Sequence, residues 1–95
     1  MNDYELTMIL DPDLTSENQK KILEKFKKLI EDGKGKISKK DDWGKKELAY
    51  PINKKKMGFY FFWEIKTSAD GIRQTDKKLK TEEGIMRHLI IRKEK

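Results

Sequence analysis

The chain has 95 residues, 35% hydrophobic and 42% charged, and its 23 Lys and Arg against 17 Asp and Glu give a net charge of +6 at pH 7. This length accommodates one domain with one modest hydrophobic core. The positive charge favours a polyanionic partner, either RNA or an acidic membrane surface. The chain holds no cysteine and one histidine, which excludes disulfides, thiol chemistry and a histidine-rich metal site.

The first residues predict a cytoplasmic protein that begins with a strand. The segment Met1–Glu5 is acidic and lacks the basic leader of a signal peptide, and no apolar run approaches the roughly 20 residues of a membrane span. Polar and apolar residues then alternate over positions 4–10, as in a half-buried strand, until Asp11-Pro12-Asp13 ends the pattern.

An amphipathic helix is predicted next. Ser16, with Gln19 three positions later, forms a capping box that would start this helix, and Gly33 marks its end. Lysines and glutamates separate the apolar residues, which recur at helical spacing: Ile22, Phe26, Leu29 and Ile30.

The segment Ile37–Ile52 predicts a long second strand with a change of register. Trp43 has the parity of Ile37, whereas Leu48 has the other parity, so a shift is needed if all the apolar residues face one side. Gly44 is the expected bulge. Pro51 offers no amide hydrogen to a neighbour, which places this strand at a sheet edge.

A lysine-rich link, residues 53–58, leads to the aromatic segment 59–65, which predicts a central strand. Ser68 is the expected N-cap of a second helix that ends near Lys80. The segment Ile85–Arg92 predicts a fourth strand, followed by a charged tail that runs to residue 95.

This βαββαβ order predicts an α+β fold, the ferredoxin-like sandwich, in which a four-stranded antiparallel sheet carries both helices on one face. Alternation would direct Phe61 and Trp63 toward the helices and leave Tyr60 and Phe62 on the uncovered face. Two aromatic side chains on that face would favour a binding partner.

Catalysis is not predicted. His88 has no nucleophile near it in sequence, which indicates a structural or surface histidine, and the carboxylates are interleaved with lysines as on solvated faces. The glycines of residues 33–36 follow a helix, whereas a phosphate-binding loop precedes one. We therefore expect no enzyme activity, no cofactor and no metal.

The positions of the basic residues predict two ridges that frame the sheet and contact phosphates. One ridge surrounds the second strand and its turn, and the other follows the last strand. Their members are Lys45, Lys46, Lys54, Lys55 and Lys56 in the first ridge and Arg87, Arg92 and Lys93 in the second.

The segment 44–53, Gly-Lys-Lys-Glu-Leu-Ala-Tyr-Pro-Ile-Asn, resembles the signature of the bacterial ribosomal protein S-six family. The resemblance continues through residues 58–63 and extends over essentially the whole chain, with comparable residues at Tyr4-Glu5, Gly33 and Ile85-Met86-Arg87. It implies the same βαββαβ fold.

The resemblance further implies a structural role in the small ribosomal subunit. The family binds the central domain of small-subunit ribosomal RNA as a heterodimer with ribosomal protein S-eighteen, without catalysis or cofactor. Carried onto this sequence, Lys45, Lys46, Tyr50 and Arg87 become candidates for the RNA or partner surface, whereas Leu48 and Ile52 become core residues. The full candidate set adds the turn, open-face and strand-end residues Lys54, Lys55, Lys56, Tyr60, Phe62 and Arg92.

Rival classes share the fold. An RNA recognition motif would have a small residue at the position of Tyr60 and a basic residue at the position of Met57. An acylphosphatase-like enzyme needs glycines and an arginine after strand one, where this chain has Asp11-Pro12-Asp13. A homodimeric ligand-binding regulatory domain stays open, and gel filtration separates it from the expected monomer.

Overall fold

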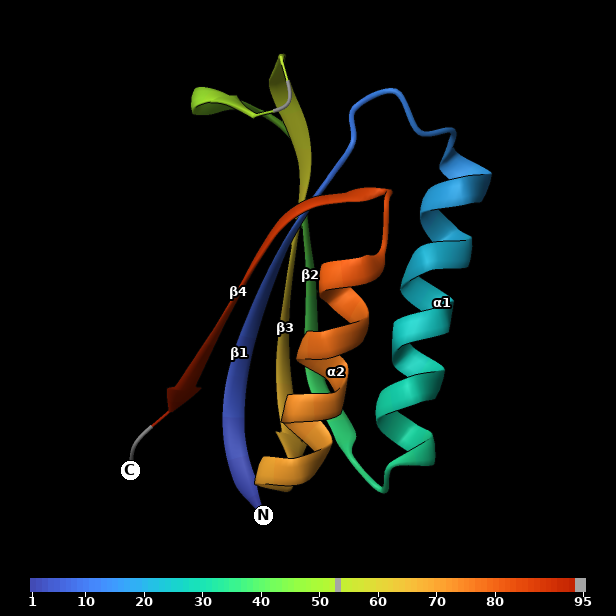
Figure 1. The fold of residues 1–95 in the computed structure, drawn as a ribbon, viewed down its shortest axis with the longest axis vertical. Helices are drawn as coiled ribbons and strands as arrows, with labels where there is room; N and C mark the ends of the chain where they lie inside the picture. The colour runs from blue at the N-terminus through green and yellow to red at the C-terminus, as the bar shows by residue number, and fades with distance from the viewer. Residues whose placement is uncertain (53, 94–95) are drawn as a thin grey trace.

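The computed structural model describes residues 1–52 and 54–93 and confirms the predicted order of elements. All strand pairs are antiparallel, in the order β2-β3-β1-β4, and both helices lie on one side of the sheet (Figure 1). Asn53 of the predicted link and the tail positions Glu94 and Lys95 lie outside the described residues. The elements are β1 (Asn2–Leu10), α1 (Ser16–Asp32), β2 (Lys36–Ile52), β3 (Lys55–Thr67), α2 (Ala69–Thr81) and β4 (Ile85–Lys93).

The two helices begin at capped N-termini. The side chain of Ser68 accepts a hydrogen bond from the amide of Gly71 at 3.0 Å, which confirms the predicted cap of α2. The predicted capping box of α1 was wrong by one position, because Thr15 rather than Ser16 is the N-cap and accepts from the Asn18 amide at 3.1 Å. Both Ser and Thr are preferred N-cap residues, so two adjacent hydroxyl residues leave the start of the helix ambiguous.

The core lies between the sheet and the helices. Alternation of β1 buries every second residue from Tyr4 to Leu10, and helical spacing brings Ile22, Phe26 and Ile30 of α1 onto that layer. The central strand β3 completes the layer with the predicted inward residues: Phe61, Trp63 and Ile65 are 6%, 3% and 0% exposed. Within the described residues, no helix covers the sheet's other face.

Strand β2 lies at the sheet edge, as Pro51 predicted. The predicted bulge is also present, since the register with β3 shifts between Asp42 and Gly44 and Gly44 has a φ of +76°. The premise behind it was wrong, however. The apolar residues of β2 do not share one side, because Ile37 pairs with buried Ile65 whereas the ring of Trp43 stacks on Phe62 of the opposite face.

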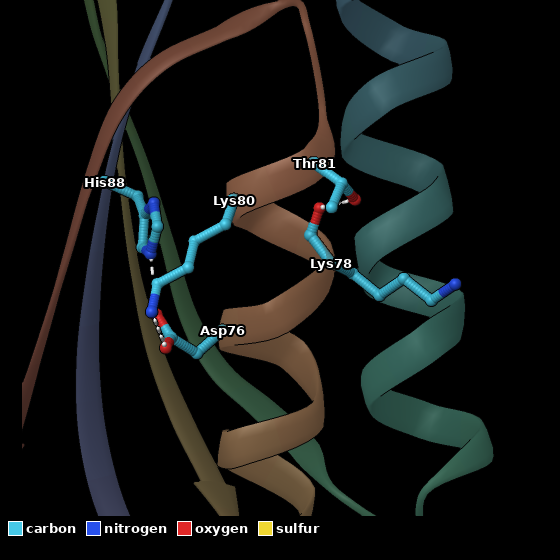
Figure 2. A network of polar contacts seen from close by, with 5 residues as sticks. All are labelled: Asp76, Lys78, Lys80, Thr81 and His88. Atoms are coloured by element: carbon cyan, nitrogen blue, oxygen red, sulfur yellow. Dashed lines mark hydrogen bonds and ion pairs between the residues drawn. The ribbon is translucent and has the colours of Figure 1, made fainter.

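Helix α2 is joined to β4 by the chain's histidine (Figure 2). His88 Nε2 donates to Asp76 Oδ1 at 2.7 Å, and Lys80 Nζ lies 3.3 Å from the other oxygen of the same carboxylate. The hydrogen bond from His88, with a smaller contribution from Lys80, holds the pKa of Asp76 below its usual value. His88 is therefore a structural residue, as its sequence context predicted.

Candidate nucleic-acid interface

The sheet face opposite the helices, here called the open face, presents two kinds of surface. Its upper half is apolar and aromatic, because the register places Tyr60 beside Ile9 and Phe62 beside Thr7. On the other side of β1, Leu89 lies opposite Thr7. Tyr60 and Phe62 are half-buried, so the predicted orientation of these two candidates is confirmed.

The lower half of the open face is charged. Glu5 of β1 pairs with Glu64 of β3, and Lys93 of β4 lies 3.1 Å from Glu64. The hydrogen bond to Glu64 raises the pKa of Lys93. Lys93 and Glu64 thus neutralise each other within the sheet, which leaves the upper half as the better candidate for a binding surface.

Two exposed aromatic residues of β2 extend the upper half, and two exposed apolar residues of β4 lie on the same face. Leu89 and Ile91 are 57% and 50% exposed, and Trp43 and Tyr50 are 45% and 56% exposed. Ile91 pairs with Glu5 and therefore lies in the lower half. The Trp43 ring lies parallel to that of Phe62, with an interplanar angle of 6° and centroids 5.4 Å apart. Exposed apolar residues gathered on one face are typical of an interaction site.

The β2–β3 arm, residues 46–52 and 54–58, projects past the rest of the sheet, and the end of β2 turns away from the helices (Figure 1). Tyr50 lies toward β4, where Arg87 donates to its hydroxyl and lies 5.6 Å from its ring centre. Leu48 is 8% exposed, as predicted for a core residue, whereas Ile52 is only half-buried.

Gly58 allows this arm to lie close to the open face. A Cβ atom at Gly58 would come within 2.5 Å of Ile9 Cγ2 and 3.1 Å of Met86 Cε. With any larger residue at this position, the Ile9 side chain or the strand would have to shift. A glycine at this position therefore suits the close packing of β3 against Ile9 and Met86.

The predicted lysine cluster of the turn is divided. Lys55 forms an ion pair with Asp13 of the loop that follows β1, which lowers the pKa of Asp13 and raises that of Lys55. Lys54, with a φ of +66°, and Lys56 are exposed. An intramolecular partner leaves Lys55 the least available of the three for a phosphate.

The two predicted basic ridges were wrong as continuous surfaces, because strand parity separates their members. Lys46 is 5.4 Å from the ring centre of Trp43 on the open face, whereas Lys45 pairs with Phe59 on the helix side. Arg92 pairs with Tyr4 and donates to Asn2 Oδ1 at 3.1 Å, also on the helix side and away from Arg87.

The structure places eight of the ten candidates on the open face or the arm: Lys46, Tyr50, Lys54, Lys55, Lys56, Tyr60, Phe62 and Arg87. Sequence reasoning missed the exposed residues Trp43, Leu89 and Ile91. For Leu89 and Ile91 the signal was present, because apolar residues of both parities in β4 indicate that some face away from the core.

The helix side holds a groove of about 620 Å³ between α1 and β2, lined at its base by Leu23, Phe61 and Trp63 and at its rim by lysines and acids. Among residues 1–52 and 54–93, no group of three or more His, Asp or Glu side chains is placed to hold a metal. No helix in the described part of the chain is long and apolar enough to cross a membrane.

The fold and this surface define a ferredoxin-like domain whose uncovered sheet face joins aromatic residues to a basic arm. The family described as ribosomal protein S6, the S-six family of the sequence resemblance, matches residues 3–92. The chain is 41% identical to the small ribosomal subunit protein bS6 of Caldanaerobacter subterraneus subsp. tengcongensis over 92 residues, covering 97% of each. It is 40% identical to that of Alkaliphilus oremlandii, with both chains fully covered.

The crystal structure of 30S ribosomal protein S6 from Thermotoga maritima superposes with a TM-score of 0.91 at 27% identity, covering 97% of this chain and 87% of that one. The chain belongs to the ribosomal protein S6 family. It is accordingly a structural, non-enzymatic protein of the small ribosomal subunit, part of the cytoplasmic ribosome, and functions in translation.

Proposed function

We propose that this protein binds the central domain of small-subunit ribosomal RNA jointly with ribosomal protein S-eighteen, and that the open face and the β2–β3 arm carry these contacts. The observation behind the proposal is the upper half of the open face, where the exposed side chains of Trp43, Tyr50 and Leu89 lie beside the basic residues Lys46 and Arg87. Apolar side chains suit a protein partner, and the adjacent cations suit phosphates.

The charge of the arm supports an RNA partner over a second copy of this chain. The arm bears Lys46, Lys54 and Lys56 as exposed cations, and an identical arm approaching the same face would place like charges together. A polyanion releases counterions when these cations neutralise its phosphates, which favours association. We therefore expect the isolated protein to be a monomer, which gel filtration checks.

The surface has a basic part and an apolar part, and this division favours joint binding of RNA by this protein and ribosomal protein S-eighteen. The few exposed lysines of the arm neutralise few phosphates, so the lone protein is expected to bind RNA weakly. A partner that covers the apolar residues of the upper half other than Trp43 would add both contact area and further cations. Titration of labelled central-domain RNA with and without ribosomal protein S-eighteen tests this. Equal and tight binding by the lone protein would contradict it.

The salt dependence of binding measures how many arm lysines contact phosphates. Each neutralised phosphate contributes roughly 0.7 to 0.9 to the slope of log affinity against log salt. Changing Lys54 and Lys56 together to Ala should flatten that slope by about one to two units. A control removes the same charge from α1, by changing the exposed Lys21 and Lys28 to Ala. If the arm variant and the α1 variant have equal salt slopes, the arm lysines do not contact phosphates and serve only to keep the protein soluble.

A further inference from the structure

Trp43 occupies an unusual position on the edge strand. Asp42 pairs with Phe61 and Gly44 pairs with Tyr60, so Trp43 is the extra residue of the bulge and lacks a partner of its own in β3. The Gly44 amide donates to Asp42 Oδ1 at 2.8 Å, and the left-handed φ of Gly44 suits a glycine. The bulge is thus fixed by local bonds, and it directs the indole ring onto the open face.

The surroundings of this ring combine an aromatic support with a cation. Phe62 lies parallel to the indole at 5.4 Å between centroids, and the Lys46 ammonium lies 5.4 Å from the indole centre. Trp43 is nevertheless 45% exposed. A smaller apolar residue would cover the Phe62 ring equally well. Covering Phe62 therefore does not explain why a large aromatic side chain is exposed here.

We propose that Trp43 is a stacking platform for an unpaired nucleobase of the bound RNA, with Lys46 as the cation for the adjoining phosphate. This inference rests on the proposed RNA binding and assigns a binding mode to it. Phe62 holds the indole in place, and the exposed part of the ring offers the base a flat aromatic surface. Any base can stack there, because every base has such a face.

Lys46 has a specific role in this arrangement. An ammonium over an exposed indole is held more weakly than a base stacked on an aromatic ring, so a base displaces it. The side chain then remains within reach of the backbone of the same nucleotide. The site therefore recognises a splayed, single-stranded nucleotide rather than a base-paired helix, whose bases are already stacked on each other.

Affinity measurements on two substitutions of Trp43 test the inference. Trp43→Leu keeps an apolar side chain but removes the ring, whereas Trp43→Phe keeps a smaller ring. With central-domain RNA and saturating ribosomal protein S-eighteen, we expect Trp43→Leu to weaken RNA binding about tenfold and Trp43→Phe by about threefold or less. Thermal melts of both variants verify that the domain stays folded.

Photochemical crosslinking supplies a readout independent of affinity. Irradiation of the wild-type complex should link the peptide containing Trp43 to a nucleotide that is unpaired in the free RNA, as mapped by mass spectrometry. Trp63, buried and 3% exposed, is the internal control and should not crosslink. A crosslink confined to base-paired nucleotides, or none at Trp43, would overturn the stacking role.

The outcomes separate this inference from the proposed function. If the wild-type heterodimer fails to bind the RNA, the proposed function fails. If the wild-type heterodimer binds the RNA and the Trp43→Leu heterodimer binds it with an affinity within twofold of wild type, the proposed RNA binding is supported and the stacking role is contradicted. If Trp43→Leu weakens binding to ribosomal protein S-eighteen in the absence of RNA, Trp43 contacts the protein partner and stacking also falls.

Discussion

The covered and open faces of the sheet are built from the same four strands, yet they have opposite chemistry. Along β3, Phe61 and Trp63 are 6% and 3% exposed, whereas Phe62 between them is half-buried and stacks on Trp43. The alternation of a single strand therefore supplies the domain with its core and its candidate interface. Neighbouring aromatic residues should respond to substitution in opposite ways.

The largest effect is expected at Trp63. Trp63→Ala removes a side chain from the centre of the core and should lower the free energy of unfolding by about 3 to 5 kcal/mol. That is most of the stability of a domain of this size. Denaturant unfolding of the free protein measures it, and a chain that fails to fold is the limiting case of the same result.

Phe62→Ala is the matched comparison on the open face. Loss of its stack with Trp43 should cost the free protein only about 1 to 2 kcal/mol, while binding to partner and RNA weakens by about 2 kcal/mol or more if Phe62 supports the interface. Equal destabilisation by the two substitutions would show that Phe62 is a core residue. The main observation in favour of the open face as a binding surface would then be contradicted.

An intermediate effect is expected at Gly58, where β3 packs closely against Ile9 of β1. Gly58→Ala places a Cβ within 2.5 Å of Ile9 Cγ2, and such overpacking should cost about 1 to 3 kcal/mol. Ile9→Ala in the same chain removes the clashing atom. The double variant should be more stable than the sum of the two single losses predicts, as measured by denaturant unfolding. Strict additivity would mean that the clash is relieved elsewhere.

The elements and the division of the two faces could be predicted because both depend on local periodicity. Alternation in β3 and helical spacing in α1 determine which side chains are buried, and Pro51 restricts β2 to an edge. The bulge at Gly44 was also predictable, but the side to which it turns Trp43 was not. That direction depends on which residues of β2 and β3 pair on either side of the extra residue.

The candidate site was only partly predictable, for two physical reasons. Lys55 and Asp13 are 42 positions apart in sequence, and no local pattern indicates their ion pair. Lys45 and Lys46, by contrast, were grouped as neighbours although adjacent strand residues point to opposite faces. Grouping basic residues by strand parity instead of by proximity assigns these two lysines to different faces from the sequence alone.

The smallest effect concerns the polar contact on the covered side, between α2 and β4. Asp76→Asn weakens the bonds from His88 and Lys80, and at pH 7 it should cost about 0.5 to 1 kcal/mol, in the range of a partly exposed ion pair. The folded-state pKa of Asp76 is lowered from 3.8, so the carboxylate stabilises the fold above that pH, and its contribution disappears as the pH falls through the folded-state value. The stability difference between wild type and Asp76→Asn should therefore shrink below about pH 4. Glu83→Gln removes the same charge from an exposed position and is the control. Urea unfolding at several pH values provides the measurement, and a difference that does not shrink as the pH falls below about 4 would show that Asp76 acts through its shape and hydrogen bonding rather than its charge.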